Sequence, residues 1–236
     1  MNFLSSDFNS IIAEQFEFVK SLSGRAEKTA NVLRHKASGK KIIYFNLKAD
    51  VSVFRFLMGI SHPNLPRVYS VEPSGGRCEI YEEFIDGITV GDVLQTGHYT
   101  ESGMKKVVQG VCSALEVLHK NKIIHRDIKP ENVIIDTRGN VKLIDFDAAR
   151  VYDPSKSGDT TFAGTAGFAA PEQFAISQTD QRSDIFSLGI MMNIMLTGDH
   201  PSSSPYGGKY GKIIEKCIQT DPNKRYNNVS ELVELL

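Results

Sequence analysis

Cysteine is scarce in this chain of 236 residues, and its three copies stand far apart. Cys78, Cys112 and Cys217 form no C-x-x-C pair, so neither a disulfide framework nor a zinc site is predicted. Cysteine usage of this kind is typical of a reducing compartment, and we expect a cytoplasmic protein.

Long hydrophobic runs and an excess of one charge are also missing. No stretch of about 18 apolar residues occurs, and no basic segment of the kind that opens a secretory signal stands at the start. Lys plus Arg number 27 against 28 for Asp plus Glu, so attraction to nucleic acid or to an anionic membrane is not expected. The sequence therefore predicts a globular protein without a nucleic-acid or membrane partner.

The hydrophobic pattern changes along the chain. Before residue 85, short apolar segments separated by turns such as ASGKK and PSGG predict a small, largely antiparallel sheet. After residue 100, apolar residues recur at helical spacing. The predicted helical segments are 107–118, 183–196, 210–219 and 229–236.

A hairpin is predicted between the first two of these helices, over residues 132–146, with polar residues at its strand ends. A strand-rich first third and a helical remainder indicate an α+β fold with two lobes. We expect a smaller β-rich lobe over about 14–85 and a larger, mainly helical lobe over about 86–236.

Polar residues suited to phosphoryl transfer gather around the predicted hairpin. That reaction needs oxygen ligands for a metal ion, a carboxylate directed at the acceptor hydroxyl, and positive charge against the phosphates. The segment HRDIKPEN, residues 125–132, contains Asp127, Lys129 and Asn132, and DFD follows at 145–147.

These motifs resemble those of the eukaryotic-type (Hanks-type) protein kinases, whose signature includes H-R-D-x-K-x-x-N, D-F-G and A-P-E. The likeness continues through GTAGFAAPE at 164–172, SDIFSLG at 183–189 and DPNKRY at 221–226, and covers roughly residues 16–236. It implies that residues 1–236 form a single two-lobed protein kinase domain of bacterial style. ATP and Mg²⁺ would be its cofactors, and its substrate a protein, which can be the chain itself.

The resemblance gives each motif residue a role. Asp127 would take or orient the proton of the acceptor hydroxyl, and Lys129 would contact the transferred phosphate. Asn132 and Asp145 would hold Mg²⁺. Lys129 and Thr165 resemble the serine/threonine type of kinase rather than the tyrosine type.

Other matches imply structural or nucleotide-binding roles. Glu172 and Arg225 resemble a buried ion pair that braces the second lobe, and Asp184 resembles the residue that holds the catalytic loop from beneath. The segment IYEEFIDG at 80–87 resembles the adenine-binding hinge, where Glu83 and Ile85 would provide backbone groups. Glu82 would then occupy the gatekeeper position.

The first lobe departs from the family pattern. Ser23, Arg25 and Lys28 stand where the family has the three glycines that let backbone approach the phosphates. Phe45 replaces the phosphate-binding lysine, and Val53 replaces the glutamate that pairs with it. The short interval between Phe45 and His62 predicts a short helix there.

Lys28 is a candidate to compensate for the lysine that Phe45 replaces. Lys28 is similar in position to the lysine that the with-no-lysine kinases place in their glycine-rich loop, and would then supply the missing positive charge. An ordinary solvated loop lysine is the alternative. Asp50 is a candidate for orienting Lys28. In the second lobe, Asp147 replaces the glycine of D-F-G.

The segment from 145 to 172 contains candidate phosphorylation sites at Thr160 and Thr161. The resemblance implies that Arg126 would receive such a phosphate and so order the loop. An unmodified loop is the alternative.

Three functions follow from these observations. The first is an ATP- and Mg²⁺-dependent serine/threonine protein kinase with an atypical nucleotide site. The second is a catalytically weak or inactive pseudokinase that binds a regulatory protein partner, an interpretation that Phe45, Val53 and Asp147 favour. Transfer to a small molecule is the third and the least favoured, because the A-P-E segment and the later helices resemble a platform for protein substrates.

Overall fold

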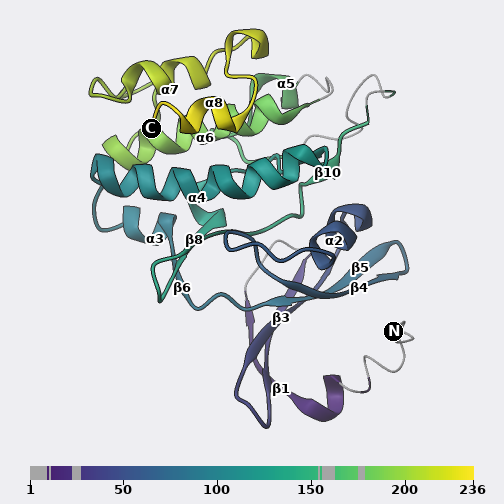
Figure 1. Cartoon of the computed structure of the whole chain (residues 1–236). Coiled ribbons are helices and arrows are strands. Elements are labelled where there is room, and N and C mark those ends of the chain that lie inside the picture. Colours follow the sequence, from purple (N-terminus) through teal and green to yellow (C-terminus); the bar gives the residue numbers. More distant parts are fainter. Residues whose placement is uncertain (1–9, 11, 23–27, 154, 156–162, 175–178) are drawn as a thin grey trace. The chain divides into compact units, whose positions relative to one another are not determined.

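The computed structural model describes residues 10, 12–22, 28–153, 155, 163–174 and 179–236. Contacts between residues divide the chain into two compact units, of which the first comprises residues 1–62 and 66–85 and the second residues 63–65 and 86–236 (Figure 1). Among the described residues, no helix is both long and apolar enough to span a bilayer. All three cysteines are free and buried.

The first unit is built on an antiparallel sheet with the strand order β1-β2-β3-β5-β4. Its strands are β1 (Phe16–Leu22), β2 (Thr29–His35), β3 (Lys41–Leu47), β4 (Val68–Ser74) and β5 (Arg77–Glu83). The predicted antiparallel sheet is thus confirmed. Strand β1 lies at one edge and is largely exposed.

A short helix, α2 (Val51–Met58), packs against β4 (Figure 1). Its buried side chains Val53, Phe54 and Leu57 recur at helical spacing and face the sheet. Asp50 caps its first turn, since the carboxylate accepts a hydrogen bond of 2.9 Å from the Ser52 amide. The short helix expected from the interval between Phe45 and His62 is therefore present.

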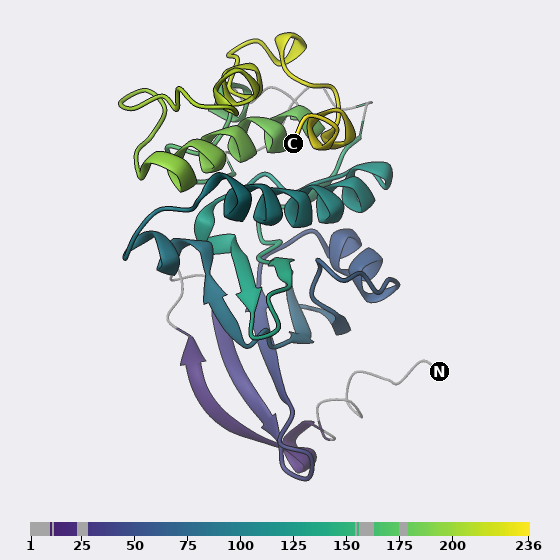
Figure 2. The ribbon, with the colours of Figure 1, turned by 60° about the vertical axis from the view of Figure 1, so that its left-hand side comes forward.

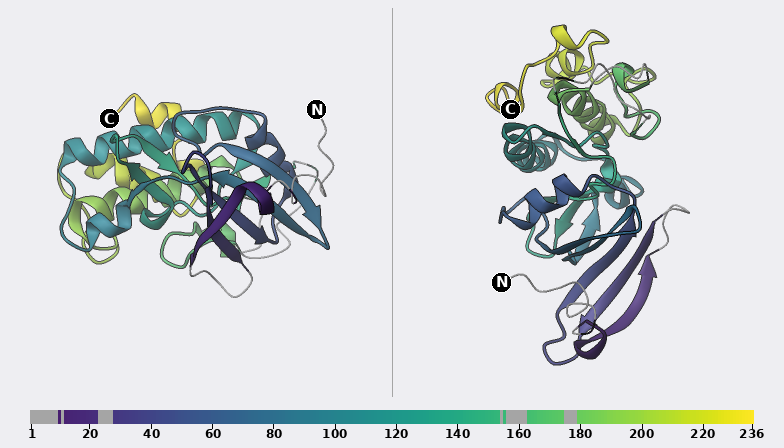
Figure 3. Two further views of the ribbon diagram at one scale, coloured as in Figure 1. Left: turned by 90° about the horizontal axis from the view of Figure 1, so that it is seen from below. Right: turned by 90° about the vertical axis from the view of Figure 1, so that its right-hand side faces the viewer.

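The second unit is mainly helical, as predicted. Its helices are α3 (Val90–Leu94), α4 (Glu101–Lys120), α5 (Pro171–Phe174), α6 (Gln181–Thr197), α7 (Gly211–Cys217) and α8 (Val229–Val233). Helices α4 and α6 run side by side, and α7 packs on α6 (Figures 1 and 2). The right-hand view of Figure 3 looks along α4 and α6.

Helices α4 and α6 form the core of this unit for different reasons. Only one face of α4 is apolar and buried, whereas α6 is buried nearly all round. At Gly189, an added Cβ would stand 2.5 Å from the Cβ of Cys217. Glycine at this position therefore permits the close approach of α6 and α7.

Two small pairings of strands position the polar loops of the second unit. Strand β6 (Gly87–Thr89) joins the hairpin of β8 (Val133–Asp136) and β9 (Val141–Leu143), and β7 (Ile123–Ile124) pairs with β10 (Arg150–Val151). The chain between β7 and β8 carries the H-R-D motif, and the chain between β9 and β10 carries D-F-D. Both pairings together bring these two loops side by side.

Candidate active site

Asp127 lies at the centre of a buried polar network. Lys129 Nζ donates to Asp127 Oδ2 at 2.7 Å and also to Thr165 Oγ1 at 2.7 Å. The Thr165 hydroxyl in turn donates to Asp127 Oδ1 at 2.6 Å. Asn132 Nδ2 donates both to Asp127 Oδ2, at 3.0 Å, and to its backbone oxygen, at 2.9 Å. The carboxylate of Asp127 is therefore held from both of its oxygens.

Asp145 is placed beside this network by its two neighbours. The Ile144 amide donates to the Asn132 carbonyl at 2.9 Å, and the ring of Phe146 meets the ring of His125 edge-on with centroids 5.0 Å apart. Asp145 itself has φ 68°, a left-handed conformation that aspartate adopts more readily than most residues. The structure thus brings the D-F-D segment, residues 145–147, to the loop of residues 125–132, which we call the catalytic loop.

His125 connects the two loops as a neutral side chain. Its Nε2 lies 3.2 Å from the Ile144 carbonyl, and its Nδ1 lies 3.4 Å from the Asp127 amide nitrogen. Complete burial lowers the pKa of His125, in spite of nearby carboxylates that act the other way. A neutral ring with its proton on Nε2 satisfies both contacts.

Asp184, at the start of α6, braces the catalytic loop from beneath. It accepts hydrogen bonds from the amides of His125 and Arg126 at 3.0 and 2.7 Å, and its Oδ2 lies 2.8 Å from His119 Nε2. Burial alone would raise the pKa of Asp184, but the hydrogen bond and charge of His119, with the hydrogen bond from the His125 backbone amide, hold it below the ordinary value of 3.8. The bracing role expected for Asp184 is what the contacts show.

The lowered pKa of Asp184 predicts how stability depends on pH. Because unfolded aspartate binds protons at a higher pH than Asp184 does in the folded protein, its contribution is fully present above 3.8 and is lost as pH falls through the lower, folded pKa. We expect Asp184→Asn to have a lower free energy of unfolding than wild type near neutral pH. This difference between the two proteins should shrink as the pH is lowered. Urea unfolding over a pH series measures the difference in free energy of unfolding, and a difference that does not depend on pH would contradict this account.

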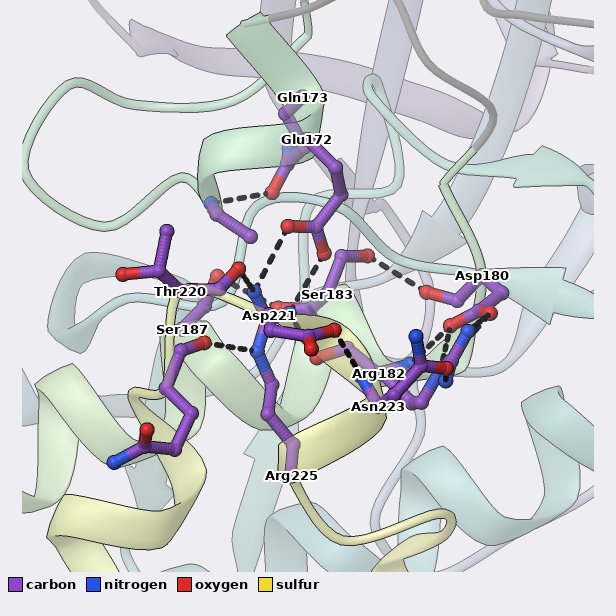
Figure 4. Close-up of polar contacts among 12 residues, drawn as sticks. Glu172, Gln173, Asp180, Arg182, Ser183, Ser187, Thr220, Asp221, Asn223 and Arg225 are labelled. Carbon is purple, nitrogen blue, oxygen red and sulfur yellow. Dashed lines mark hydrogen bonds and ion pairs between the residues drawn. The ribbon is translucent and has the colours of Figure 1, made fainter.

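Glu172 and Arg225 form the predicted ion pair (Figure 4), in which the Arg225 side chain is fully buried and that of Glu172 is 13% exposed. Arg225 reaches both carboxylate oxygens of Glu172, at 2.7 and 2.9 Å, in a bidentate arrangement. The same guanidinium donates to the backbone oxygens of Arg182, Gln219 and Thr220 and lies 4.8 Å from the Phe186 ring centroid. Its role is to join α5 to α6 and to the segment after α7.

Lys28 lies beside the residue that replaces the family lysine of β3. Its Nζ stands 4.6 Å from the centroid of the Phe45 ring, within the range of a cation–π interaction. The register pairs Ala30 of β2 with Phe45 of β3, and Lys28 lies two residues before Ala30, immediately ahead of β2. Lys28 is half-buried rather than fully solvated.

The remaining predicted nucleotide-site residues lie in or just after β5. The Glu83 amide donates to the Arg67 carbonyl at 2.8 Å, and the Glu83 carboxylate accepts from the Arg67 amide at 3.1 Å. The Glu83 amide is therefore engaged in a hydrogen bond within the first unit. Ile85 follows the strand and is 9% exposed, and Glu82 is buried on the sheet. Their roles toward adenine stay predictions.

Several sequence interpretations are not addressed by this geometry. Ser23, Arg25, Thr160 and Thr161 lie outside the described residues, so phosphorylation of the two threonines stays a prediction. Arg126, their expected partner, donates from Nε to the Ala148 carbonyl at 2.7 Å. Asp50 is engaged in capping α2, which gives it a structural role apart from any toward Lys28.

Two residues of the site were not singled out by the sequence. His119 belongs to the periodic face of α4, where it could not be told from a surface residue, yet it contacts Asp184. Gln173 follows Glu172 in α5 and forms hydrogen bonds with Ala170, just before the helix, and with Arg126 and Ala163 in two other segments. The only available signal was the position of Gln173 directly after the A-P-E motif.

Together these residues can perform one kind of chemistry. A fixed carboxylate can receive a hydroxyl proton, an adjacent ammonium can contact a negatively charged group, and neighbouring amide and carboxylate oxygens can bind a hard cation. This combination matches the requirements of phosphoryl transfer.

The sequence of this chain is similar to those of known protein kinases, in agreement with the chemistry of the site. The sequence model of the protein kinase domain matches residues 26–234. Serine/threonine-protein kinase PknB of Mycobacterium tuberculosis is 33% identical over 213 residues, which cover 83% of this chain and 34% of that protein. Serine/threonine-protein kinase C of Synechocystis is 28% identical over 203 residues, covering 76% and 38%. Mitogen-activated protein kinase kinase 1 of Arabidopsis thaliana is 26% identical over 268 residues, covering 96% and 75%.

The PknB relatives are longer proteins, and the matched part spans about a third of their length. The family match nevertheless covers most of this chain, including strands β2 to β5 of the first unit and the polar network of the second. On the strength of the family match and the 33% identity to PknB, the chain belongs to the protein kinase domain family.

Proposed function

We propose that this protein is a serine/threonine protein kinase that transfers the γ-phosphate of ATP to a hydroxyl of a protein, with Mg²⁺ as cofactor. The observation that carries the proposal is the network in which Lys129, Asn132 and Thr165 hold Asp127. The contact between Lys129 and Thr165 supports the serine/threonine type, which is also the type in the names of the PknB relatives.

Asp127 would accept a hydrogen bond from the hydroxyl that attacks the phosphate and would receive its proton. Lys129, which already contacts Asp127, would place its positive charge against the transferred group. Because Thr165 and Asn132 fix the carboxylate, little rearrangement is needed before reaction, and preorganisation of this kind accounts for much of the catalytic effect in such sites.

The donor set fits Mg²⁺. Magnesium prefers oxygen ligands and is commonly held by one or two protein groups together with phosphate oxygens and water. Asn132 directs its amide nitrogen at Asp127, so its Oδ1 would be the ligand atom, and the carboxylate of Asp145 would be the second. Within the described residues, no cluster of three or more His, Cys, Asp or Glu side chains is suited to a metal. Bound Mg²⁺ would neutralise phosphate charge.

We also propose that Lys28 supplies the positive charge that family members obtain from β3. Phosphate binding and the transition state both require such charge, and Phe45 cannot provide it. The position of Lys28 Nζ over the ring of Phe45 supports the substitution, because the amine lies next to the side chain that occupies the usual lysine position.

Lys28→Met is therefore expected to lower kcat by about 10²-fold, the effect of removing one preorganised charge donor. Two matched controls are available: Lys40, whose Nζ lies over the Tyr69 ring at 5.3 Å, and Lys48, which is exposed. Lys40→Met and Lys48→Met should retain near wild-type rates. Initial rates at saturating ATP measure the difference, and equal rates for Lys28→Met and wild type would rule out the compensation.

The function itself is tested by measuring ADP formation with an acceptor protein, in the presence of Mg²⁺ and after its removal with a chelator. We expect ADP formation that depends on both the acceptor and Mg²⁺. Binding of ATP without any ADP formation, or no binding at millimolar nucleotide, would instead support a pseudokinase, an alternative that the replacements at Phe45 and Val53 favour.

A further inference from the structure

Gln173 is a buried amide that joins three segments of the second unit. It is 3% exposed. Its Oε1 accepts a hydrogen bond at 2.9 Å from the amide of Ala170, the residue before α5. Its Nε2 donates to the Arg126 carbonyl at 3.0 Å and to the Ala163 carbonyl at 2.6 Å. Both hydrogens of the amide are therefore used, each on a backbone oxygen.

Each of these carbonyls lies within two residues of a member of the Asp127 network. Arg126 immediately precedes Asp127, and Ala163 lies two residues before Thr165, which donates to Asp127. Gln173 thus crosslinks the catalytic loop and the segment of Thr165 from outside the network, without contacting Asp127, Lys129 or Thr165 through any of these three bonds.

The backbone is conformationally demanding at Arg126 and at Gly164, the residue after Ala163. Arg126 has φ 66°, a region that side chains other than glycine seldom adopt and that must be held by its surroundings. Its amide is held by Asp184 at 2.7 Å and its carbonyl by Gln173. The peptide groups on either side of Arg126 are therefore fixed from two directions, from α6 and from α5.

Gly164 has φ 130°, and an added Cβ there would stand 2.8 Å from Gln173 Nε2. The close approach of the amide to this segment thus depends on glycine. Glutamine also fits the polarity, because one end must accept and the other must donate twice. A carboxylate would place a negative charge against two carbonyl oxygens. An apolar side chain would leave all three backbone groups without the hydrogen bond that Gln173 provides.

We propose that Gln173 is a positioning residue for phosphate transfer: it locks the catalytic loop to the Thr165 segment, so that Asp127 and Thr165 meet in one geometry. The proposal rests on the proposed kinase function. It predicts that loss of the amide changes the rate of the chemical step rather than nucleotide binding, since Gln173 acts through other residues.

The test compares Gln173→Met and Gln173→Glu with wild type in the full chain, and uses Gln181→Glu as the matched control. Gln181 also donates its amide to a backbone oxygen, that of Asn227 at 2.6 Å, but it lies away from the network. Gln173→Met should lower kcat by between about 10-fold and 10²-fold, the larger value being the loss caused by misplacement of a reacting group by about 1 Å. The KM for ATP should not change. Gln181→Glu should retain kcat.

The pH profile of Gln173→Glu separates positioning from a loss of stability. Burial raises the pKa of an introduced carboxyl, and its protonated form can donate one of the two lost hydrogen bonds. The kcat of Gln173→Glu relative to wild type at the same pH should therefore rise as pH is lowered. A constant ratio, or wild-type kcat in Gln173→Met together with a lower melting temperature, would overturn the proposal.

Hydrogen exchange provides a readout that does not require activity. In Gln173→Met, the amides of residues 125–128 and 163–170 should exchange faster, while those of α4 should not change. If wild type itself transfers no phosphate, the kinase function fails, and faster exchange confined to these two segments would still support the crosslink. Unchanged exchange in both segments would refute the crosslink whatever the activity of wild type.

Discussion

Asp127→Ala is expected to lower the rate of phosphate transfer by about 10²- to 10⁴-fold, the usual contribution of a positioned acid–base group. The variant loses the group that orients the acceptor hydroxyl, whereas Asn132 and Lys129 remain in place and Lys129 keeps its contact with Thr165. The protein should therefore still fold, which a thermal melt verifies. Rates at saturating ATP and acceptor measure the loss.

The matched control for this variant is Asp199→Ala. Asp199 is an aspartate of the same unit that is exposed, and its replacement should leave the rate unchanged. If Asp127→Ala transfers phosphate at the wild-type rate under the conditions in which Asp199→Ala is active, Asp127 has no role in the reaction.

Arg225→Met is expected to lower the free energy of unfolding by about 3–5 kcal/mol, because it leaves the Glu172 carboxylate, which is only 13% exposed, without its charge partner. Three backbone oxygens lose their donor in the same change. Urea unfolding of the variant and wild type measures the difference. Replacing both partners, in Glu172→Gln with Arg225→Met, should cost less than the sum of the single changes.

An exposed ion pair of the same length provides the control. Arg34 and Glu17 are also 2.7 Å apart, but their side chains are 51% and 45% exposed, so Arg34→Met should cost less than about 1 kcal/mol. Similar losses for Arg34→Met and Arg225→Met would show that burial does not govern the strength of the pair at Arg225.

The strands and helices were predictable where the apolar pattern is regular, and their ends were not. The helix predicted over 107–118 extends over Glu101–Lys120, because its first turn is polar and starts at Thr100, whose hydroxyl accepts from the Gly103 amide. Such a capping signal is local and weak beside hydrophobic periodicity.

The site was predictable in the parts that are contiguous in sequence. Asp127, Lys129 and Asn132 share one short motif, so their proximity follows from the chain itself. The contact of Thr165 with Asp127 links residues 38 apart, and that of Gln173 with Arg126 links residues 47 apart. Their geometry depends on how α5 and the preceding segment return to the catalytic loop, which no local pattern encodes.

Lys28 is an intermediate case. Its position in the sequence suggested a compensating charge, but its placement over Phe45 depends on the register between β2 and β3. A shift of one residue would turn Lys28 to the other face of the sheet.

The central proposal is that this chain moves a phosphoryl group from ATP to a protein hydroxyl. Mass spectrometry of wild-type protein and an acceptor protein, after incubation with Mg²⁺ and ATP carrying an isotope label in its γ-phosphate, tests that claim most directly. We predict labelled phosphoserine or phosphothreonine in wild-type reactions and almost none with Asp127→Ala. Folded wild-type protein that binds ATP yet leaves every serine and threonine unlabelled would contradict the claim.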